Sequence, residues 1–288
     1  MSEKIIITTF TDPMMGLSWE CEPLFRKLET HFARQIEFRT VMALLVRNVR
    51  DFMTPDELAL PSAEGIRRYN ARLAKIYESE EPISGMPINM TEFCLFSMEQ
   101  PSSLPLNLAY HAAKLTDASK ADLFLYNLRY ATIVDCRPTT ETDELVNVAK
   151  TTGIDTDAFA RHLRDGSAEA ALKEDLRLVR SMGIRSLPAY LLQYGEKAML
   201  LRSFDYQDFV SVISQLTGGA IKPRSVDPAV QTLREFLCGH PLVSSVELRE
   251  AFDLSDTDTV QELVQPLIEN GEVKIEEVYH GWFVKVKP

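Results

Sequence analysis

The side chains with the greatest chemical potential in this sequence are its thiols, and they lie far apart. The four cysteines are separated by 73, 42 and 102 residues, and they are Cys21, Cys94, Cys136 and Cys238. These spacings contain neither a Cys-x-x-Cys redox motif nor half of a zinc site. The five histidines are scattered as well. We therefore expect no bound metal ion, and each cysteine is most simply a small core residue.

Ser18 is a second candidate for chemistry, within the run Gly16-Leu17-Ser18-Trp19-Glu20. Its first half matches a Gly-x-Ser-x-Gly nucleophile elbow, in which the serine is exposed on a sharp strand-to-helix turn. Glu20 replaces the second glycine, and the rest of the chain lacks a hydrolase pattern. We interpret Ser18 as an ordinary helix residue, with a contact to a ligand as the alternative.

Composition limits the classes of function. The chain has 288 residues, of which 45% are hydrophobic, and this is enough for one large domain or two ordinary ones. Its net charge of −11 repels phosphate backbones and disfavours general nucleic-acid binding. The sequence has neither a signal-type start nor an apolar run of about 18 residues. We expect a cytoplasmic protein that does not enter a membrane and whose thiols are reduced.

Sequence periodicity places Ser18 at the start of a helix between two strands. Residues 4–10 are β-branched and apolar, 15–32 have helical spacing, and 35–42 alternate between apolar and polar. This pattern predicts a β-α-β unit. Strand signals then disappear, and helical spacing recurs in five segments: 55–79, 104–130, 141–150, 155–165 and 168–182.

Two further strands and a helix complete the pattern. Strands are predicted at 188–194 and 197–203, with Gly195-Glu196 as a tight hairpin turn, and a helix at 205–216. The order of β-α-β, a helical block and β-β-α indicates an α/β thioredoxin fold with a large helical insertion. We assign residues 1–44 and 184–218 to the thioredoxin-like domain, and residues 45–183 to the insertion.

The last 70 residues predict a linker and a small α+β domain. Residues 219–228 are rich in glycine and proline. Within 229–288, three helices precede two strands, and this is the winged-helix order. The helices are expected at 229–238, 246–252 and 256–270, and the strands at 272–278 and 281–287.

The run around Ser18 resembles the first-helix motif of DsbA-family oxidoreductases, in particular the FrnE-like branch. That motif is of the type Asp-Pro-Met-Cys-x-x-Cys-Trp-x-Phe-Glu-Pro. The alignment needs no gap and matches six positions: Asp12, Pro13, Met14, Trp19, Glu22 and Pro23. The segment 183–190 resembles the one that bears the family's cis-proline, here Pro188. The resemblance covers about residues 4–216 and implies a thioredoxin fold with the family label of oxidoreductase.

Both redox cysteines of the family are replaced. Met15 holds the position of the attacking cysteine and Ser18 that of the resolving cysteine. Attack on a disulfide requires a thiolate, which neither a thioether nor a hydroxyl can supply. We therefore predict that this motif cannot exchange disulfides.

The frame of the motif is intact, so the resemblance implies a retained binding surface. A helix start offers free N–H groups and the positive end of the helix dipole. In thioredoxin folds the backbone before the cis-proline pairs with extended peptides. We predict a peptide-binding, protein-binding or adaptor protein whose ligand contacts seven residues: Met15, Gly16, Leu17, Ser18, Trp19, Leu187 and Pro188.

Two alternatives stay open, and with them the question of enzyme activity. Kappa-class glutathione transferases and hydroxychromene carboxylate isomerases resemble this arrangement, with a serine at the helix start. Glutathione is therefore a candidate cofactor, and otherwise none is expected. The second alternative is a thiol oxidoreductase that uses a cysteine outside the motif, such as Cys21.

The charge of the C-terminal segment favours a protein partner. Residues 227–288 contain five basic and twelve acidic side chains, a net charge of −7. The helix expected at 256–270 would be the recognition helix, and it contains neither lysine nor arginine. A helix in the major groove needs positive charge to offset the phosphates. We expect contacts with protein, including a homodimer, rather than with DNA.

Overall fold

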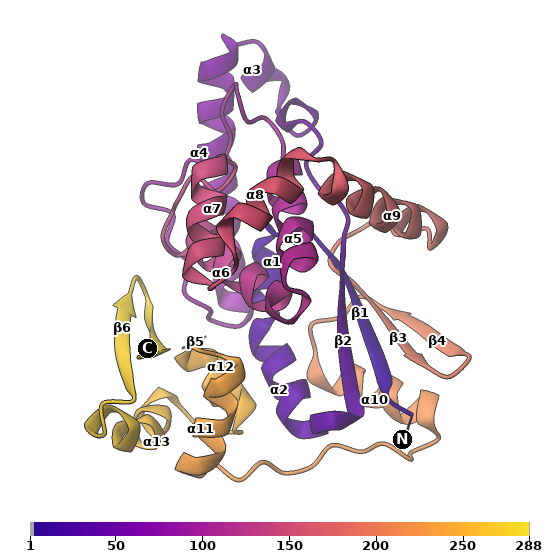
Figure 1. Cartoon of the computed structure of the whole chain (residues 1–288), viewed down its shortest axis with the longest axis vertical. Coiled ribbons are helices and arrows are strands. Elements are labelled where there is room, and N and C mark those ends of the chain that lie inside the picture. Colours follow the sequence, from indigo (N-terminus) through magenta and orange to yellow (C-terminus); the bar gives the residue numbers. More distant parts are fainter. Residues whose placement is uncertain (1–2, 288) are drawn as a thin grey trace.

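A four-stranded sheet organises the N-terminal two thirds of the protein in a computed structural model that describes residues 3–287 (Figure 1). The strand order is β2-β1-β3-β4. β1 (Ile5–Thr11) pairs in parallel with β2 (Ile36–Met42) and antiparallel with β3 (Ala189–Tyr194). β3 forms a hairpin with β4 (Lys197–Leu201). The four predicted strands, and their order along the chain, are confirmed.

The helix expected over residues 15–32 is divided in two. α1 (Gly16–Glu20) and α2 (Glu22–Phe32) meet at Cys21. Pro23 accounts for the break, because it has no N–H to donate to the carbonyl of Trp19 four residues earlier. The break allows α1 and α2 to contact different parts of the protein.

Helices cover both faces of the sheet. α2 and α10 (Tyr206–Thr217) pack on one face, where Ile7 and Leu192 contact the same apolar core as Leu28. Val179 of α9 packs on the other face against Phe10. This alternation follows from the two-residue period of a strand, which sends successive side chains to opposite faces.

The insertion consists of helices and loops, and its residues make up most of the largest core of the protein. Two predicted segments are interrupted. Pro61 precedes the second helix of the first segment, and Asp117 caps a short 3-10 turn in the second by accepting from the Ser119 N–H. The helices are α3 (Pro55–Leu58), α4 (Ser62–Glu80), α5 (Leu104–Thr116), α6 (Ala121–Ile133), α7 (Thr142–Thr151), α8 (Thr156–Arg164) and α9 (Ser167–Ser181). The 3-10 turn η3 (Glu81–Ile83) follows α4.

The C-terminal unit has its own three-stranded antiparallel sheet, with strand order β5-β7-β6. Its three helices and last two strands fall where the sequence predicts them. The sequence pattern missed β5, because three residues are too few for an alternation to appear. The elements are α11 (Val230–Gly239), β5 (Leu242–Ser244), α12 (Ser245–Ala251), α13 (Thr257–Glu269), β6 (Val273–Val278) and β7 (Gly281–Val286).

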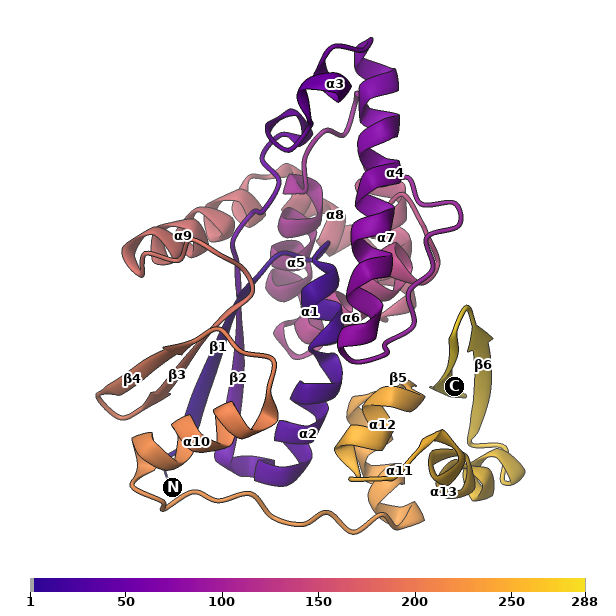
Figure 2. The same cartoon turned by 180° about the vertical axis from the view of Figure 1, so that it is seen from behind.

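The C-terminal unit docks on α2. Both views show α12 beside α2, with the segment after α10 running along the base of the molecule to α11 (Figure 2). The Thr30 hydroxyl donates to the Ala251 carbonyl at 2.7 Å, and Phe283 packs in the same core as Trp19. Among residues 3–287, no helix combines the length and apolar character needed to cross a membrane.

Candidate functional site

The start of α1, where the family motif would lie, is buried. Met15 is the residue before the helix, is 6% exposed, and makes no side-chain cap. The Ser18 hydroxyl shares a hydrogen bond of 2.7 Å with the Thr11 hydroxyl. Ser18 is 3% exposed, so its hydroxyl faces the protein rather than a ligand.

α4 covers this helix start. The Tyr77 hydroxyl donates to the Met14 carbonyl. A Cβ atom at Gly16 would overlap the Tyr77 ring and the Glu80 carboxyl group, so this position accepts only glycine without rearrangement. Burial raises the pKa of Glu80 to about 7. The start of α1 therefore faces a helix of the insertion.

Asp12 fixes the connection between β1 and α1. Its carboxylate accepts from the backbone N–H groups of Met14 and Leu45, at 3.1 and 2.8 Å, and from the side chains of Ser103 and Asn107, each at 2.8 Å. Burial raises the pKa of Asp12 although all four hydrogen bonds act to lower it. Asp12 thus has a structural role, because it ties the motif to the insertion.

Trp19 lies at the junction of the three parts of the chain. It is fully buried, and its Nε1–H donates to the Pro87 carbonyl at 3.1 Å. Its ring centroid lies 5.3 Å from that of Tyr126 in α6 and 6.3 Å from that of Phe283 in β7. These contacts give Trp19 a packing role between units.

The Leu187–Pro188 peptide bond is cis. Pro188 is buried, and Leu187 is half-buried against the apolar cluster that contains Phe10 and Ala189. Of the seven predicted contact residues, only Leu17 and Leu187 are partly exposed. Neither of the two cavities beside α2 is lined by any of these seven residues. A ligand groove at the motif therefore stays a prediction, and it rests on the side chains of Leu17 and Leu187.

Cys21 is not poised as a nucleophile. It is 1% exposed, and the Tyr190 hydroxyl donates to its sulfur at 3.0 Å. Burial raises the pKa of the Cys21 thiol to about 12, so almost no thiolate exists near neutral pH. All four cysteines are free thiols.

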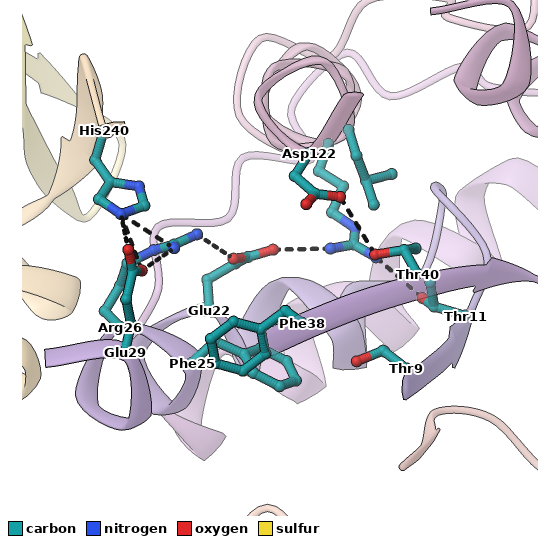
Figure 3. A pocket seen from close by; sticks show the side chains of 12 residues that line it. Thr9, Thr11, Glu22, Phe25, Arg26, Glu29, Phe38, Thr40, Asp122 and His240 are labelled. Carbon is teal, nitrogen blue, oxygen red and sulfur yellow. Dashed lines mark hydrogen bonds and ion pairs between the residues drawn. The ribbon is translucent and has the colours of Figure 1, made fainter. Parts of the chain in front are cut away.

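A charged network that the sequence analysis missed connects the motif to the C-terminal unit (Figure 3). The Arg129 guanidinium donates to Thr11 Oγ1 at 3.0 Å and pairs with Glu22 at 2.7 Å. Glu22 also pairs with Arg26 at 2.8 Å, and Arg26 reaches Glu247 of α12 at 3.2 Å. A cavity of about 210 Å³ lies beside this network. One signal was present in the sequence: an arginine inside the apolar helix over residues 121–133 requires a buried anion.

His240 extends the network at its outer end. Its Nε2 lies 2.9 Å from a carboxylate oxygen of Glu29, which also pairs with Arg26 at 3.0 Å. Burial acts to raise the pKa of Glu29, but His240 and Arg26 together lower it to about 2. The network is internally paired, and this favours a role in holding α12 against α2.

Comparisons with known proteins give relatives of the whole chain and of its fold. The ClpXP adapter protein SpxH of Bacillus subtilis (strain 168) is 25% identical over 285 residues, which cover 97% of this chain and 88% of the relative. A protein of Nitrosomonas europaea described as a disulfide isomerase has a TM-score of 0.60 at 15% identity, covering 75% of this chain and 100% of that one. A probable DsbA oxidoreductase from Streptomyces coelicolor has a TM-score of 0.57 at 16% identity, covering 77% and 94%.

These solved structures establish a DsbA-like thioredoxin fold, and the alignment with SpxH extends through the C-terminal unit. A family model described as Thioredoxin, named Thioredoxin_5, matches residues 8–201, which is more than half of the chain. This match spans the sheet, the replaced motif and the helical insertion. The chain therefore belongs to the Thioredoxin_5 family of thioredoxin-fold proteins.

Proposed function

We propose that this protein is a cytoplasmic adaptor that binds another protein without exchanging disulfides, and that it delivers this client to a ClpXP-type protease. The observation that carries the proposal is the state of the motif. Met15 and Ser18 replace both cysteines, and α4 seals the helix start on which they lie. A thioredoxin fold without a nucleophile or access to one keeps its surfaces but not its redox reaction.

The relatives give the proposal its specific form. SpxH is described as a ClpXP adapter, and it aligns over 97% of this chain. The alignment therefore includes the C-terminal unit, which the Thioredoxin_5 match does not reach. At 25% identity the client of the relative is not transferred, so we propose the adaptor class and leave the client open.

We further propose that residues 229–288 form a winged-helix domain used for contacts with protein. Its net charge of −6 opposes binding to phosphate backbones and favours a protein surface, with a second copy of this chain as one candidate. We propose three other units: the thioredoxin-like domain of residues 1–44 and 184–218, the insertion of residues 45–183, and the linker of residues 219–228. The part of the C-terminal unit's surface on α12 is already in contact with α2 within the chain.

The redox part of the proposal is tested by restoring the motif. We expect the wild-type protein to be inactive in an insulin-reduction assay. In the Met15→Cys/Ser18→Cys variant, the two introduced thiols should react with a thiol reagent at least about tenfold more slowly in the folded protein than in the unfolded protein, since both positions are buried. Insulin reduction by the wild-type protein would overturn the proposal. Glutathione binding in a calorimetric titration would favour the transferase alternative.

The adaptor part is tested by protein half-lives. An adaptor deletion and a ClpX deletion in the source organism should stabilise the same client, and the purified protein should accelerate degradation of that client by ClpXP. The matched control is a client that ClpXP degrades without assistance. If no half-life depends on both genes, the adaptor function is wrong.

A further inference from the structure

A groove on the outer side of α1 and α2 lies where the thioredoxin part, the insertion and the C-terminal unit meet. Its volume is about 240 Å³. The end of α1 and the start of α2 form its floor, η3 and the residue after it form one wall, and the segment before α10 forms another. α12 completes it, beside α2 in both views (Figures 1 and 2). None of the residues that line this groove lines the cavity beside the charged network.

Two large apolar side chains are exposed on its walls. Ile83 is 47% exposed and Phe204 is 41% exposed, although they come from segments 121 residues apart. Leu24, which is 8% exposed, also lines the groove. Exposed apolar residues that gather around one concave surface indicate a binding site, whereas single ones are ordinary.

The groove also contains a buried carboxyl group that is only half satisfied. Glu20 is 3% exposed, and one of its oxygens, Oε2, accepts from the backbone N–H and the hydroxyl of Ser84 at 3.0 and 2.6 Å. The other oxygen, Oε1, is buried and has no hydrogen-bond partner within residues 3–287. A buried acceptor without a donor is unfavourable, so a donor supplied by a bound molecule would be stabilised there.

The nearby cations cannot be that donor, because they are already paired. Lys27 pairs with Glu250 at 3.2 Å and with Asp253 at 2.8 Å. Arg249 pairs with Glu250 at 3.3 Å. With Glu20 ionised, the lining has three acidic side chains and two basic ones, in a protein of net charge −11. Charge complementarity therefore favours a basic occupant.

We propose that this groove binds a short segment of a partner protein in which a lysine or arginine is adjacent to large apolar residues. The basic side chain donates to Glu20 Oε1, and the apolar side chains lie between Ile83 and Phe204. The inference rests on the proposed protein-binding function, and it identifies where on the surface and by which chemistry a client is held. It also gives the C-terminal unit a role, because α12 supplies one side of the groove.

The test uses the full chain and three fluorescently labelled peptides in an anisotropy titration. The first peptide is Gly-Ser-Leu-Lys-Phe-Ser-Gly. The second has glutamate in place of lysine, and the third has serine in place of leucine and phenylalanine. We expect the first to bind at least about tenfold more tightly than either of the others, since it alone supplies both the donor and the apolar contacts.

Variants of the protein locate the site. Glu20→Gln keeps the shape of the side chain but cannot carry the negative charge that a bound lysine or arginine would stabilise, and we expect it to weaken binding of the first peptide about tenfold or more. Phe204→Ser should weaken it by a similar factor. The matched control is Phe52→Ser, at a phenylalanine that is 44% exposed before α3, away from the groove. Circular dichroism checks that each variant is folded.

The outcomes separate this inference from the proposed function. If the first peptide does not bind, or binds equally well to Glu20→Gln, the groove inference is wrong. In that case accelerated degradation of a client by ClpXP would still support the adaptor function. If the peptide binds as expected but the half-life experiment fails, the groove stands and the adaptor function does not.

Discussion

The two sides of the α1–α2 pair differ in what they leave open. At the start of α1, Tyr77 and Glu80 of α4 cover Gly16, and Ser18 bonds within the protein. On the outer side, Glu20 lines a groove whose walls come from all three parts of the chain. Additions to a thioredoxin fold can therefore cover the site of the redox motif on one side of a helix pair and create a concave surface on the other side.

The largest effect is expected at the residue that joins the two sides. Trp19→Ala removes a fully buried ring that contacts Tyr126 and Phe283 and donates to the Pro87 carbonyl. Loss of such a side chain costs about 3–5 kcal/mol of unfolding free energy. Urea unfolding followed by circular dichroism measures it. A loss below about 1 kcal/mol would show that the three parts do not share a core at Trp19.

Ionisation of Glu20 gives the second prediction. Burial raises the pKa of Glu20 to about 8, although the hydrogen bonds from Ser84 act to lower it. The unfolded chain releases this proton near pH 4.5, so between about pH 4.5 and 8 the folded state binds more protons. The contribution of Glu20 to stability is therefore present below about pH 4.5 and is lost as the pH rises through 8.

Glu20→Gln removes this dependence. We expect the free energy of unfolding of the wild type, relative to the variant, to fall with rising pH by up to about 1.4 kcal/mol per pH unit within that window. Unfolding titrations at several pH values measure the difference. Glu29 is a control of opposite sign: its lowered pKa contributes stability above pH 4.5 that is lost as the pH falls towards 2. Parallel curves for wild type and Glu20→Gln would contradict the buried state of Glu20.

The sequence was sufficient to predict the thioredoxin part, but it predicted neither the burial of the start of α1 nor the groove lined by Glu20. β1 was predictable from its run of β-branched and apolar residues, and β2 from its alternation of apolar and polar residues, because each pattern is typical of a strand. The replaced motif was visible because six flanking residues keep their spacing. The covering of Gly16 was not visible, because Tyr77 and Glu80 are about 60 residues away in a helix whose packing direction no local pattern encodes.

The groove was beyond sequence analysis for a similar reason. Glu20 follows Trp19 as an ordinary polar helix residue, and nothing local indicates that Ser84 will satisfy only one of its oxygens. Ile83 and Phe204 are single apolar residues in turns, and they become a site only when the fold brings them together. Periodicity predicts which face of an element is buried, but it does not predict which distant segments meet there.

Gly16→Ala tests the closed side with a smaller effect. The added methyl group would overlap Tyr77 and Glu80, and overpacking of this kind costs about 1–3 kcal/mol. Gly239→Ala is the matched control, since a Cβ at that position, at the end of α11, has no atom within 4 Å among the described residues. The control should change stability by less than about 1 kcal/mol, towards greater stability. Equal effects at the two glycines would mean that α4 does not seal the motif.

The smallest effect is expected at the edge of the open side, where Asp253 pairs with Lys27 at 2.8 Å and with His31 at 3.0 Å. Asp253 has a positive φ of 52°, a conformation that asparagine also tolerates, so Asp253→Asn removes charge without adding backbone strain. The side chain of Asp253 is 47% exposed, and exposed pairs contribute about 0.2–1 kcal/mol. Thermal unfolding at low and at high salt should show a small loss that disappears at high salt. A salt-independent loss would assign Asp253 to the buried contacts that hold α12 on α2, and the groove would then depend on this residue for its shape rather than for its charge.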